Sequence, residues 1–300
     1  MEKKFLPIFS RHEPSVMDST ALTTFMMCPR KYFFRMVLGF APKTTEQYFV
    51  FGGAYHKFRE ILETEFASGK SPVESYQAAT NAAQHYFERH GGNPKPKTRY
   101  DFLTSERLDK SMIAAFQHWL KEKKEDRIKV IATEQPFLLE MDDGTTIAGR
   151  ADQIIEWNGA VWGRDFKTSS KTGPFYNRTL EPNDQFTRYT WAESKLTGRR
   201  VKGQIIEVMF NDKKNGPKIE VLTSSRTEWQ LKQWEQDHKF WMKLIQMCRE
   251  NDEWPMNTKS CAFCEFRDVC VAPSVNAMAS QLKSYFAVRP WDCTKVDQDD

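Results

Sequence analysis

Three strand-like runs separated by two tight turns lie in the middle of the chain. Residues 128–139 are followed by Asp142-Asp143-Gly144, residues 146–157 by Asn158-Gly159, and residues 161–167 complete the set. Asp-Gly and Asn-Gly pairs between such runs are typical of β-hairpin turns. The pattern therefore predicts an antiparallel meander, and its two faces limit how the rest of the chain can pack.

Helical periodicity dominates the sequence on both sides of this meander. Asp18 to Thr20 supply helix-capping side chains, Pro29 suits the first turn of a helix, and Gly91-Gly92 marks a break between helices. The expected helices are 21–27, 30–38, 53–66, 72–90, 105–124, 183–196 and 227–249, with a further strand pair at 203–211 and 218–223.

This order of elements predicts an α/β protein with a central mixed β-sheet flanked by helices. With 300 residues and 40% hydrophobic side chains, the chain can bury the core of one large domain. We expect a single domain at 1–300. Its parts would be a helical region at 1–125, the sheet core at 126–225, a C-terminal helix with a cysteine-rich loop at 226–290, and a loose tail at 291–300.

Composition excludes several classes of protein. The chain is too apolar to be disordered, and no apolar run approaches the roughly 20 residues of a membrane-spanning helix. Residues 1–10 lack the basic start and the apolar stretch of a signal peptide, so we expect a cytoplasmic protein with no membrane partner. Because the net charge is only +4, an anionic partner would be held by local patches.

The third run of the meander contains Asp165-Phe166-Lys167, and the second contains Asp152. Residues two apart on a strand share a face, so Asp165 and Lys167 are expected to project together while Phe166 turns into the core. The hairpin can set Asp152 beside Asp165. Paired carboxylates suit Mg²⁺ or Mn²⁺. A nearby lysine can orient an attacking water or neutralise charge that grows on a phosphate.

Spacing alone does not single out this lysine, because an acidic residue two before a lysine also occurs at 122–124, 193–195, 212–214 and 237–239. Those segments lie in expected helices or turns. Asp165 and Lys167 lie in an apolar strand, where a charged pair is costly without a partner or a metal. The alternative is a surface hairpin with ordinary ion pairs.

The cysteines favour a metal site over disulfides, because the chain lacks a secretion signal. Cys261, Cys264 and Cys270 form a compact triplet that needs a fourth thiol to complete a four-thiolate site. The two spaced pairs of a zinc ribbon are absent. Cys248 and Cys293 are interpreted as spare thiols.

Five motifs in this order resemble those of the RecB-like branch of the PD-(D/E)XK nuclease superfamily, over almost the whole chain. They are Gly53-Ala54-Tyr55-His56, similar to the helical histidine motif; Glu134-Gln135-Pro136-Phe137, similar to the strand before the active-site hairpin; Gly149-Arg150-Ala151-Asp152 and Asp165-Phe166-Lys167, similar to the two carboxylate motifs; and Gln185 to Tyr189, similar to the Q-x-x-x-Y helix. The one departure is Ala151, where the family often has proline.

The resemblance implies a restriction-endonuclease-like core and a role for each matching residue. Lys167 would serve the attacking water, Gln185 and Tyr189 would position Lys167 or the DNA backbone, and Glu134 would be a less certain neighbour of the metal. Taken singly, His56 on an amphipathic helix is more often a capped or core histidine than a ligand, and Gln185 and Tyr189 are also explained by packing on one helix face. By the resemblance, the metal ligands would be His56, Asp152, Asp165 and the backbone carbonyl of Phe166, and the catalytic residues Asp152, Asp165, Lys167, Gln185 and Tyr189.

Cys28, which precedes Pro29, is similar to the distant N-terminal cysteine of iron-sulfur nucleases, among them AddB-type and CRISPR-associated adaptation nucleases. The match implies a [4Fe-4S] cluster held by Cys28, Cys261, Cys264 and Cys270. Such a staple closes a very long loop, which is worth about 5 kcal/mol in an idealised model. The alternative is that Cys28 is a buried helix cysteine and the triplet binds zinc or nothing.

We therefore expect a Mg²⁺- or Mn²⁺-dependent DNA nuclease, an exonuclease in recombination, repair or processing, that acts on single-stranded or free-ended duplex DNA. No P-loop motif is present, so a helicase or recombination partner would separate strands. Basic segments at 30–35, 199–202 and 213–214 can contact phosphates, although solvated surface explains each as well. The alternatives are a non-catalytic DNA-binding or assembly protein on the same scaffold and a sequence-specific endonuclease.

Overall fold

The computed structural model describes residue 6 and residues 8–12, 14–93, 102–171 and 173–294. The chain divides into two compact units: residues 1–44, 137–149 and 229–300, and residues 45–136 and 150–228. We describe each unit by itself. The single domain expected from the sequence stays a prediction, and most of the tail expected at 291–300 lies outside the described residues.

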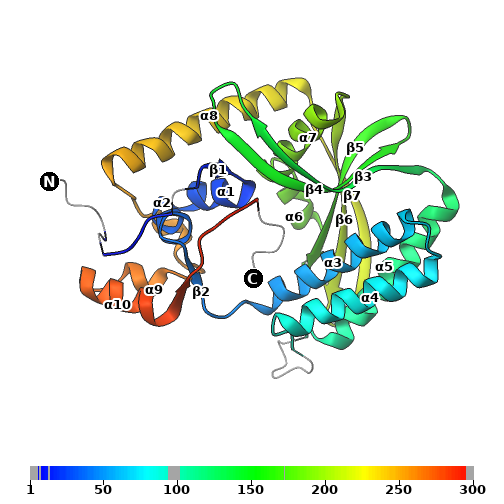
Figure 1. Ribbon diagram of the computed structural model, residues 1–300, viewed down its shortest axis with the longest axis horizontal. Coiled ribbons are helices and arrows are strands. Elements are labelled where there is room, and N and C mark those ends of the chain that lie inside the picture. Colours follow the sequence, from blue (N-terminus) through cyan, green and yellow to red (C-terminus); the bar gives the residue numbers. More distant parts are fainter. Residues whose placement is uncertain (1–5, 7, 13, 94–101, 172, 295–300) are drawn as a thin grey trace. The chain divides into compact units, whose positions relative to one another are not determined.

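The second unit is built on a mixed β-sheet, which confirms the fold class expected from the sequence (Figure 1). Strand β3 (Ile128–Glu140) pairs with β4 (Thr146–Trp157), and β4 pairs antiparallel with β5 (Ala160–Ser169). Strand β5 pairs parallel with β6 (Val201–Asp212), which pairs antiparallel with β7 (Gly216–Ser225). The parallel pair needs a crossover, and the helix α7 (Asp184–Thr197) lies within it.

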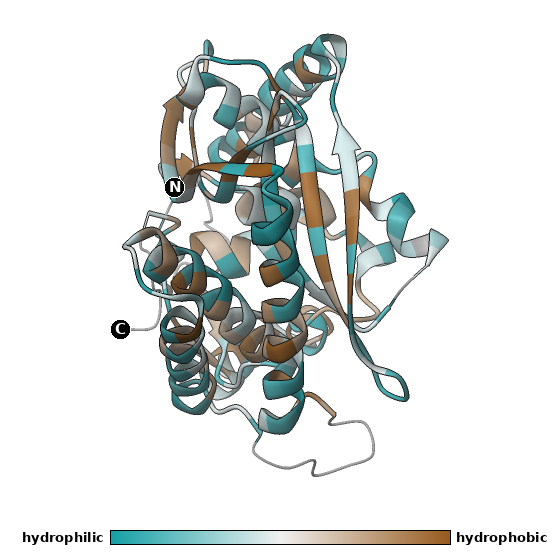
Figure 2. Cartoon of the chain, turned by 90° about the vertical axis from the view of Figure 1, so that its right-hand side faces the viewer, coloured by the Kyte–Doolittle hydropathy of each residue, from teal (hydrophilic) through white to brown (hydrophobic). Residues whose placement is uncertain are grey.

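Helices cover both faces of this sheet. The helices α3 (Gln47–Ala67), α4 (Pro72–Arg89) and α5 (Ser105–Glu125) pack together and bury Phe166 and Met209. The helix α7 covers the other face, where Phe186 packs on Val208. Figure 2 shows hydrophobic and hydrophilic residues alternating along the strands and helices, as expected of elements with one buried side. The short helices α6 (Pro174–Asn177) and η2 (Arg178–Leu180) follow β5.

Helix α3 begins at Gln47, earlier than the expected start at Gly53. Gly53 lies inside the helix, where its lack of a side chain is needed for packing. A Cβ on Gly53 would lie 2.5 Å from the hydroxyl oxygen of Tyr86 on α4, so glycine here allows two helices to approach closely. From the sequence alone, the same glycine is expected to mark the start of the helix.

The first unit holds the chain's N- and C-terminal segments. Aromatic residues form much of its core, including Tyr32 and Phe33, whose rings stack on Trp254. Its strands pair in short ladders: β1 with the first residues of β4, and β2 with β8. Its elements are β1 (Val16–Met17), α1 (Ser19–Met27), α2 (Pro29–Tyr32), η1 (Phe33–Val37), β2 (Phe40–Pro42), α8 (Glu228–Asn251), η3 (Thr258–Ser260), α9 (Arg267–Cys270), α10 (Val275–Tyr285) and β8 (Phe286–Val288).

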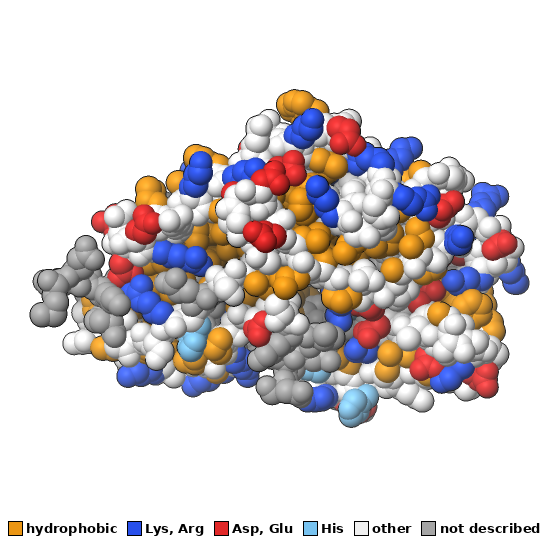
Figure 3. All heavy atoms as spheres, turned by 45° about the horizontal axis from the view of Figure 1, so that its top comes forward, with side chains coloured by type: hydrophobic (Ala, Val, Ile, Leu, Met, Phe, Trp, Pro, Cys, Tyr) orange, Lys and Arg blue, Asp and Glu red, His pale blue; other side chains and the backbone are white. Residues whose placement is uncertain are grey.

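Among the described residues, no helix is both long and apolar enough to span a membrane. Lysines and arginines are interspersed with acidic side chains on the face drawn in Figure 3. Positive and negative side chains are therefore mixed on that face.

Candidate active site and cysteine pocket

Asp152 and Asp165 lie side by side on the β4–β5 hairpin. Gln153 pairs with Arg164, so the register sets the two aspartates opposite one another at the next position. Asp152 Oδ2 accepts a hydrogen bond from the Phe166 backbone N–H at 2.8 Å. Asp165 is 1% exposed, and the Asp152 side chain is 13% exposed. The hairpin therefore removes two neighbouring carboxylates from most of their water.

Lys167 shares the face of Asp165, as strand alternation predicts. Its Nζ donates to Asp165 Oδ1 at 2.9 Å. Burial by itself lowers the pKa of Lys167, but the charges of Asp165 and Asp152 outweigh it and raise that pKa. Burial raises the pKa of both aspartates, and Lys167 opposes the rise in each.

One oxygen of this cluster lacks a partner. Asp165 Oδ2 is buried and accepts no hydrogen bond, while Oδ1 accepts from both Lys167 and Gln185. A buried carboxylate oxygen without a donor is costly. Two carboxylates beside one ammonium also leave excess negative charge. Both features fit a divalent cation, which would bind to carboxylate oxygens here.

His56 approaches the carboxylates from α3. Its Nδ1 lies 3.5 Å from Asp152 Oδ2, and its side chain is 36% exposed. Burial first and Lys167 second lower the pKa of His56 to about 4, against the opposing effects of Asp165 and of a hydrogen bond to the Phe166 backbone. The imidazole is therefore neutral at physiological pH and keeps a lone pair that a metal can take.

Glu134 is a third carboxylate beside this pair. Its backbone has a φ of +49° within β3, a left-handed conformation that is rare for a side chain of this kind. The guanidinium Nε of Arg150 lies 2.9 Å from Glu134 Oε2. Burial and the charge of Asp152 raise the pKa of Glu134 to about 7. This carboxyl group can thus exchange a proton near neutral pH.

Helix α7 closes the other side of the site. The side chain of Asn183 caps the helix by accepting from the Phe186 N–H at 3.2 Å. Gln185 Nε2 donates to Asp165 Oδ1 at 3.3 Å. Tyr189 lies one turn further on the same helix face and is half-buried. The structure thus brings His56, Asp152, Asp165, Lys167 and Gln185 together, with Tyr189 next along the helix.

Two residues near this cluster had no signal in the sequence. Tyr176, on α6, packs edge-on against Phe210 with ring centroids 5.3 Å apart. Burial raises the pKa of Tyr176, and Lys167 and Asp165 also act on its phenol. Glu193 is buried on α7 and accepts from Gln204 at 2.7 Å, and burial raises its pKa well above the usual value. Neither residue belongs to a recognisable motif.

A buried network of charges lies beneath Phe166, on the face of the sheet opposite Lys167. The Arg59 guanidinium lies 4.1 Å from the centre of the Phe166 ring and donates to Glu207 at 2.7 Å. Arg164 donates to Glu207 and, at 2.8 Å, to both oxygens of Glu122. The network therefore anchors the strand that carries Asp165 and Lys167, and no motif in the sequence indicates it.

The same network contains a group with the spacing of a metal site. Ligand atoms of His118, Glu122 and Glu207 lie within 4.8 Å of one another. However, the Arg164 guanidinium donates to both of these carboxylates, so a cation already lies between them. We assign this group to the arginine network. The hairpin aspartates, Asp152 and Asp165, are the better candidate ligands for a divalent ion.

Replacing Arg164 by methionine is expected to lower the free energy of unfolding by about 3 kcal/mol, because Glu207 would remain buried without this partner. Chemical denaturation measures the change. The control is Lys110→Met, whose partner Glu106 is 77% exposed, and which is expected to leave the free energy of unfolding unchanged. Equal stability of the Arg164 variant and the wild type would contradict the role of the network.

Mn²⁺ is expected to bind more tightly as the pH rises from 4.5 to about 7, with no further gain from Glu134 above that range. Below its raised pKa, Glu134 holds a proton that a neighbouring cation must displace. His56, with a pKa near 4, stays neutral over most of this range.

The raised pKa of Glu134 also makes the metal-free fold slightly less stable as the pH rises from 4.5 to about 7. The reason is that Glu134 in the unfolded chain releases its proton at a lower pH. Calorimetric titration with Mn²⁺ measures the binding, and chemical denaturation of the metal-free protein measures the stability. An unaltered pH profile in Glu134→Gln would argue against this carboxyl group as the source of both effects.

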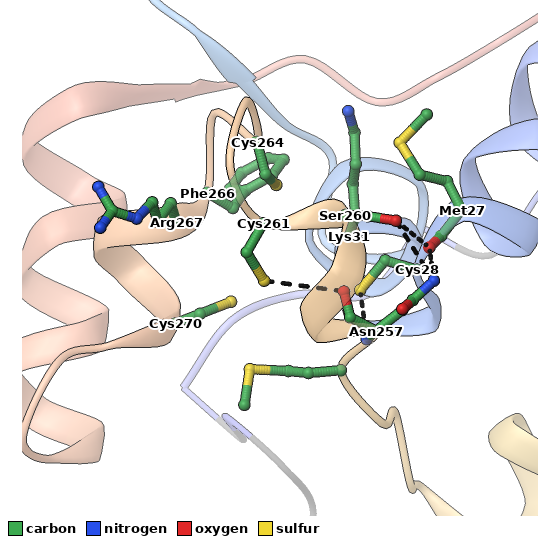
Figure 4. A pocket seen from close by; sticks show the side chains of 11 residues that line it. Met27, Cys28, Lys31, Asn257, Ser260, Cys261, Cys264, Phe266, Arg267 and Cys270 are labelled. Atoms are coloured by element: carbon green, nitrogen blue, oxygen red, sulfur yellow. Dashed lines mark hydrogen bonds between the residues drawn. The ribbon is translucent and has the colours of Figure 1, made fainter.

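The first unit gathers four cysteines around one pocket, shown in Figure 4. Cys28 lies between α1 and α2, Cys261 and Cys264 follow η3, and Cys270 ends α9. All four are free thiols. The cavity that remains between their side chains is small, about 10 Å³. Residues from both ends of the sequence therefore converge on one sulfur-lined space.

The backbone around Asn257 holds two of these thiols. The Asn257 N–H donates to Cys28 Sγ at 3.4 Å, and Cys261 Sγ donates to the Asn257 carbonyl at 3.7 Å. Burial raises the pKa of Cys270 to about 11, and the other three cysteines add to the rise against the effect of Arg30. Four thiolates in such a pocket need a positively charged group to stabilise them, which fits a bound metal centre.

Comparison with known protein families identifies the chain's wider group. The sequence model of the PD-(D/E)XK nuclease superfamily matches residues 19–271. The chain belongs to this superfamily. As a PD-(D/E)XK nuclease, it is a member of a group of enzymes that use divalent metals, in agreement with the partnerless oxygen of Asp165. The matched region contains the hairpin carboxylates, His56 and the four pocket cysteines.

Solved structures support the fold. A protein named "Putative exonuclease" from Eubacterium rectale has a TM-score of 0.52 and 10% sequence identity, over 85% of this chain and 87% of that one. The protein SSO0001 aligns with a TM-score of 0.32 and 14% identity, over 73% of this chain and 85% of its own, which is too weak a likeness to use. A search of curated proteins finds no match. The first likeness supports a restriction-endonuclease-like core for this PD-(D/E)XK nuclease.

Proposed function

We propose that this PD-(D/E)XK nuclease is a RecB-like DNA exonuclease that hydrolyses phosphodiester bonds at the β4–β5 hairpin. The observation that carries the proposal is the buried pair Asp152 and Asp165, with a partnerless oxygen on Asp165 and the ammonium of Lys167 at 2.9 Å from its other oxygen. This arrangement combines a cation-binding face with a fixed positive charge. Both are needed where a phosphate gains negative charge during hydrolysis.

In this proposal Asp152, Asp165, His56 and the Phe166 carbonyl hold one Mg²⁺ or Mn²⁺. The bound ion would supply Lewis-acid stabilisation of the phosphate and would make a nearby water more acidic. The Phe166 N–H fixes one oxygen of Asp152, which leaves the remaining oxygens of the pair for the ion. The neutral imidazole of His56 can donate its lone pair without first losing a proton.

Lys167 orients the attacking water and neutralises charge on the phosphate. Its Nζ is held by Asp165, while its side chain stays 28% exposed, so the ammonium can reach a bound substrate. Gln185 fixes Asp165 from α7. Tyr189, on the same helix face, would contact the DNA backbone. The pKa of Glu134 is raised in the metal-free protein, and this carboxyl group would lose its proton when the ion binds nearby.

The pocket cysteines are proposed to hold a [4Fe-4S] cluster as a structural staple of the first unit. The support for this proposal is the convergence of four free thiols from both ends of the sequence on one pocket. Four thiolates can bind either an iron-sulfur cluster or zinc, and metal analysis of the purified protein distinguishes the two.

The exonuclease proposal is tested with linear and circular single-stranded DNA of the same sequence, incubated with Mg²⁺ or Mn²⁺. We expect the linear DNA to be digested from an end and the circle to survive. A ladder that ends at fixed internal sites, or digestion of the circle, would indicate an endonuclease. Tight binding without digestion of either DNA would favour a non-catalytic binding protein. The same assay with RNA tests the preference for DNA.

A further inference from the structure

Two adjacent aromatic residues face solvent at the start of α3. Tyr48 is 56% exposed and Phe49 is 62% exposed, although most large apolar residues of this helix are buried. Their ring centroids lie 4.3 Å apart at an interplanar angle of 41°. Exposing a large ring costs free energy unless something covers it part of the time. The surroundings of the two rings indicate what that partner is.

The position of Phe49 relative to the proposed active site follows from helix geometry. Phe49 and His56 are separated by about two turns, so their side chains leave α3 in nearly the same direction about 10 Å apart along the axis. Gly52 lies between them, and a Cβ there would be 3.3 Å from Thr168 Oγ1 on β5. Helix α3 thus runs along β5, with His56 beside Phe166, Gly52 beside Thr168, and Phe49 near the end of the strand.

A cation lies where β5 ends. Ser170 and Lys171 are both exposed. The Ser169 hydroxyl donates to the Lys171 carbonyl and accepts from the Lys171 N–H, each at 3.0 Å, so the backbone that carries this ammonium is held in a tight turn. An exposed ring and an ammonium therefore flank the same end of the strand that carries Lys167.

We propose that Phe49, supported by Tyr48, is a stacking surface for an unpaired base of single-stranded DNA, and that Lys171 binds a phosphate of the same strand. Aromatic rings beside cations are how proteins bind single strands without reading their sequence. Because Phe49 leaves α3 about 10 Å along the axis from His56, a base stacked on it would belong to a strand that also reaches the proposed active site. The inference rests on the proposed nuclease function and adds that the bound DNA is unpaired next to the active site.

The test measures binding of fluorescent oligo-dT and of a blunt duplex in a chelator, where no cleavage occurs. Phe49→Ala is expected to weaken oligo-dT binding about 10-fold and to leave duplex binding within about 2-fold. Phe49→Trp is expected to bind like the wild type. Lys171→Gln is expected to reduce the salt slope of oligo-dT binding by about 0.7, the contribution of one phosphate. The matched control is Phe240→Ala, a ring that is 57% exposed on α8.

Two outcomes would overturn the proposal. Unchanged oligo-dT binding by Phe49→Ala would leave the rings to another partner, such as a protein. An equal loss for oligo-dT and duplex would indicate a general disturbance of α3. Hydrolysis of thymidine 5′-monophosphate p-nitrophenyl ester with Mn²⁺ separates this proposal from the nuclease proposal. The wild type and Phe49→Ala are expected to cleave it equally, whereas no cleavage by the wild type would count against the nuclease function alone.

Discussion

Replacing Lys167 by methionine, or Asp165 by asparagine, is expected to lower kcat for DNA cleavage by about 10³-fold while the protein stays folded. Lys167 donates to Asp165 at 2.9 Å and supplies the positive charge nearest to the two aspartates in the described hydrogen-bond network. The Asp165→Asn variant would keep the volume of the side chain but lose the charge that attracts a divalent cation. Single-turnover cleavage of end-labelled DNA measures both variants, and circular dichroism measures their folding.

The chain offers a matched control for this prediction. Asp212 and Lys214 have the same spacing as Asp165 and Lys167 but follow one another in a turn, where Asp212 accepts from the Lys214 N–H at 2.9 Å. Asp212→Asn and Lys214→Met are expected to leave kcat unchanged. Normal activity of both Lys167→Met and Asp165→Asn would remove the hairpin from the mechanism.

Replacing Cys264 by alanine is expected to cost the protein its iron and to lower the free energy of unfolding of the first unit by as much as about 5 kcal/mol. The pocket joins the N-terminal helices to the C-terminal loop, which also meet where Arg30 Nε donates to the Trp254 carbonyl at 2.6 Å and Lys31 pairs with Glu265 at 2.9 Å. Without the cluster, these contacts and the packing of Tyr32 and Phe33 on Trp254 remain to hold the N-terminal helices. Limited proteolysis is expected to show new cleavage before residue 60, and DNA binding is expected to weaken before the carboxylates are affected.

Cys293 provides the control for this variant, because it does not line the pocket. Cys293→Ala is expected to keep its iron, its absorbance and its resistance to protease. Full iron content in Cys264→Ala, or a proteolysis pattern with no new cut before residue 60, would contradict the staple. Colourless wild-type protein that contains zinc and still cleaves DNA would replace the proposed cluster with a zinc site.

Local patterns were sufficient to predict the elements that carry the site. The Asn158-Gly159 turn fixes the β4–β5 hairpin, because both residues tolerate the positive φ angles of 49° and 72° that the turn requires. Strand alternation then predicts that Asp165 and Lys167 share a face and that Phe166 is buried. The expected helix 183–196 begins at Asn183, which the structure makes the N-cap of α7, and this contact also reaches only three residues along the chain.

Contacts between distant residues could not be predicted in this way. Arg59 and Glu207 are separated by 148 positions and form a fully buried pair, yet an arginine on an amphipathic helix normally indicates a solvated face. Tyr176 lies in a segment with no periodicity, so its nearness to Lys167 depends on how α6 folds back after β5. Strands β1, β2 and β8 have only two or three residues each, too few to show an alternating pattern.

The most direct test of the central claim is a metal titration of DNA cleavage by the wild-type protein, purified without oxygen, on end-labelled single-stranded DNA. If Asp152, Asp165 and Lys167 form the active site, we expect no cleavage in a chelator and cleavage that increases with added Mg²⁺ or Mn²⁺. Cleavage is expected to stop again when the chelator is restored. Tight DNA binding with no cleavage at any concentration of either metal would contradict the claim.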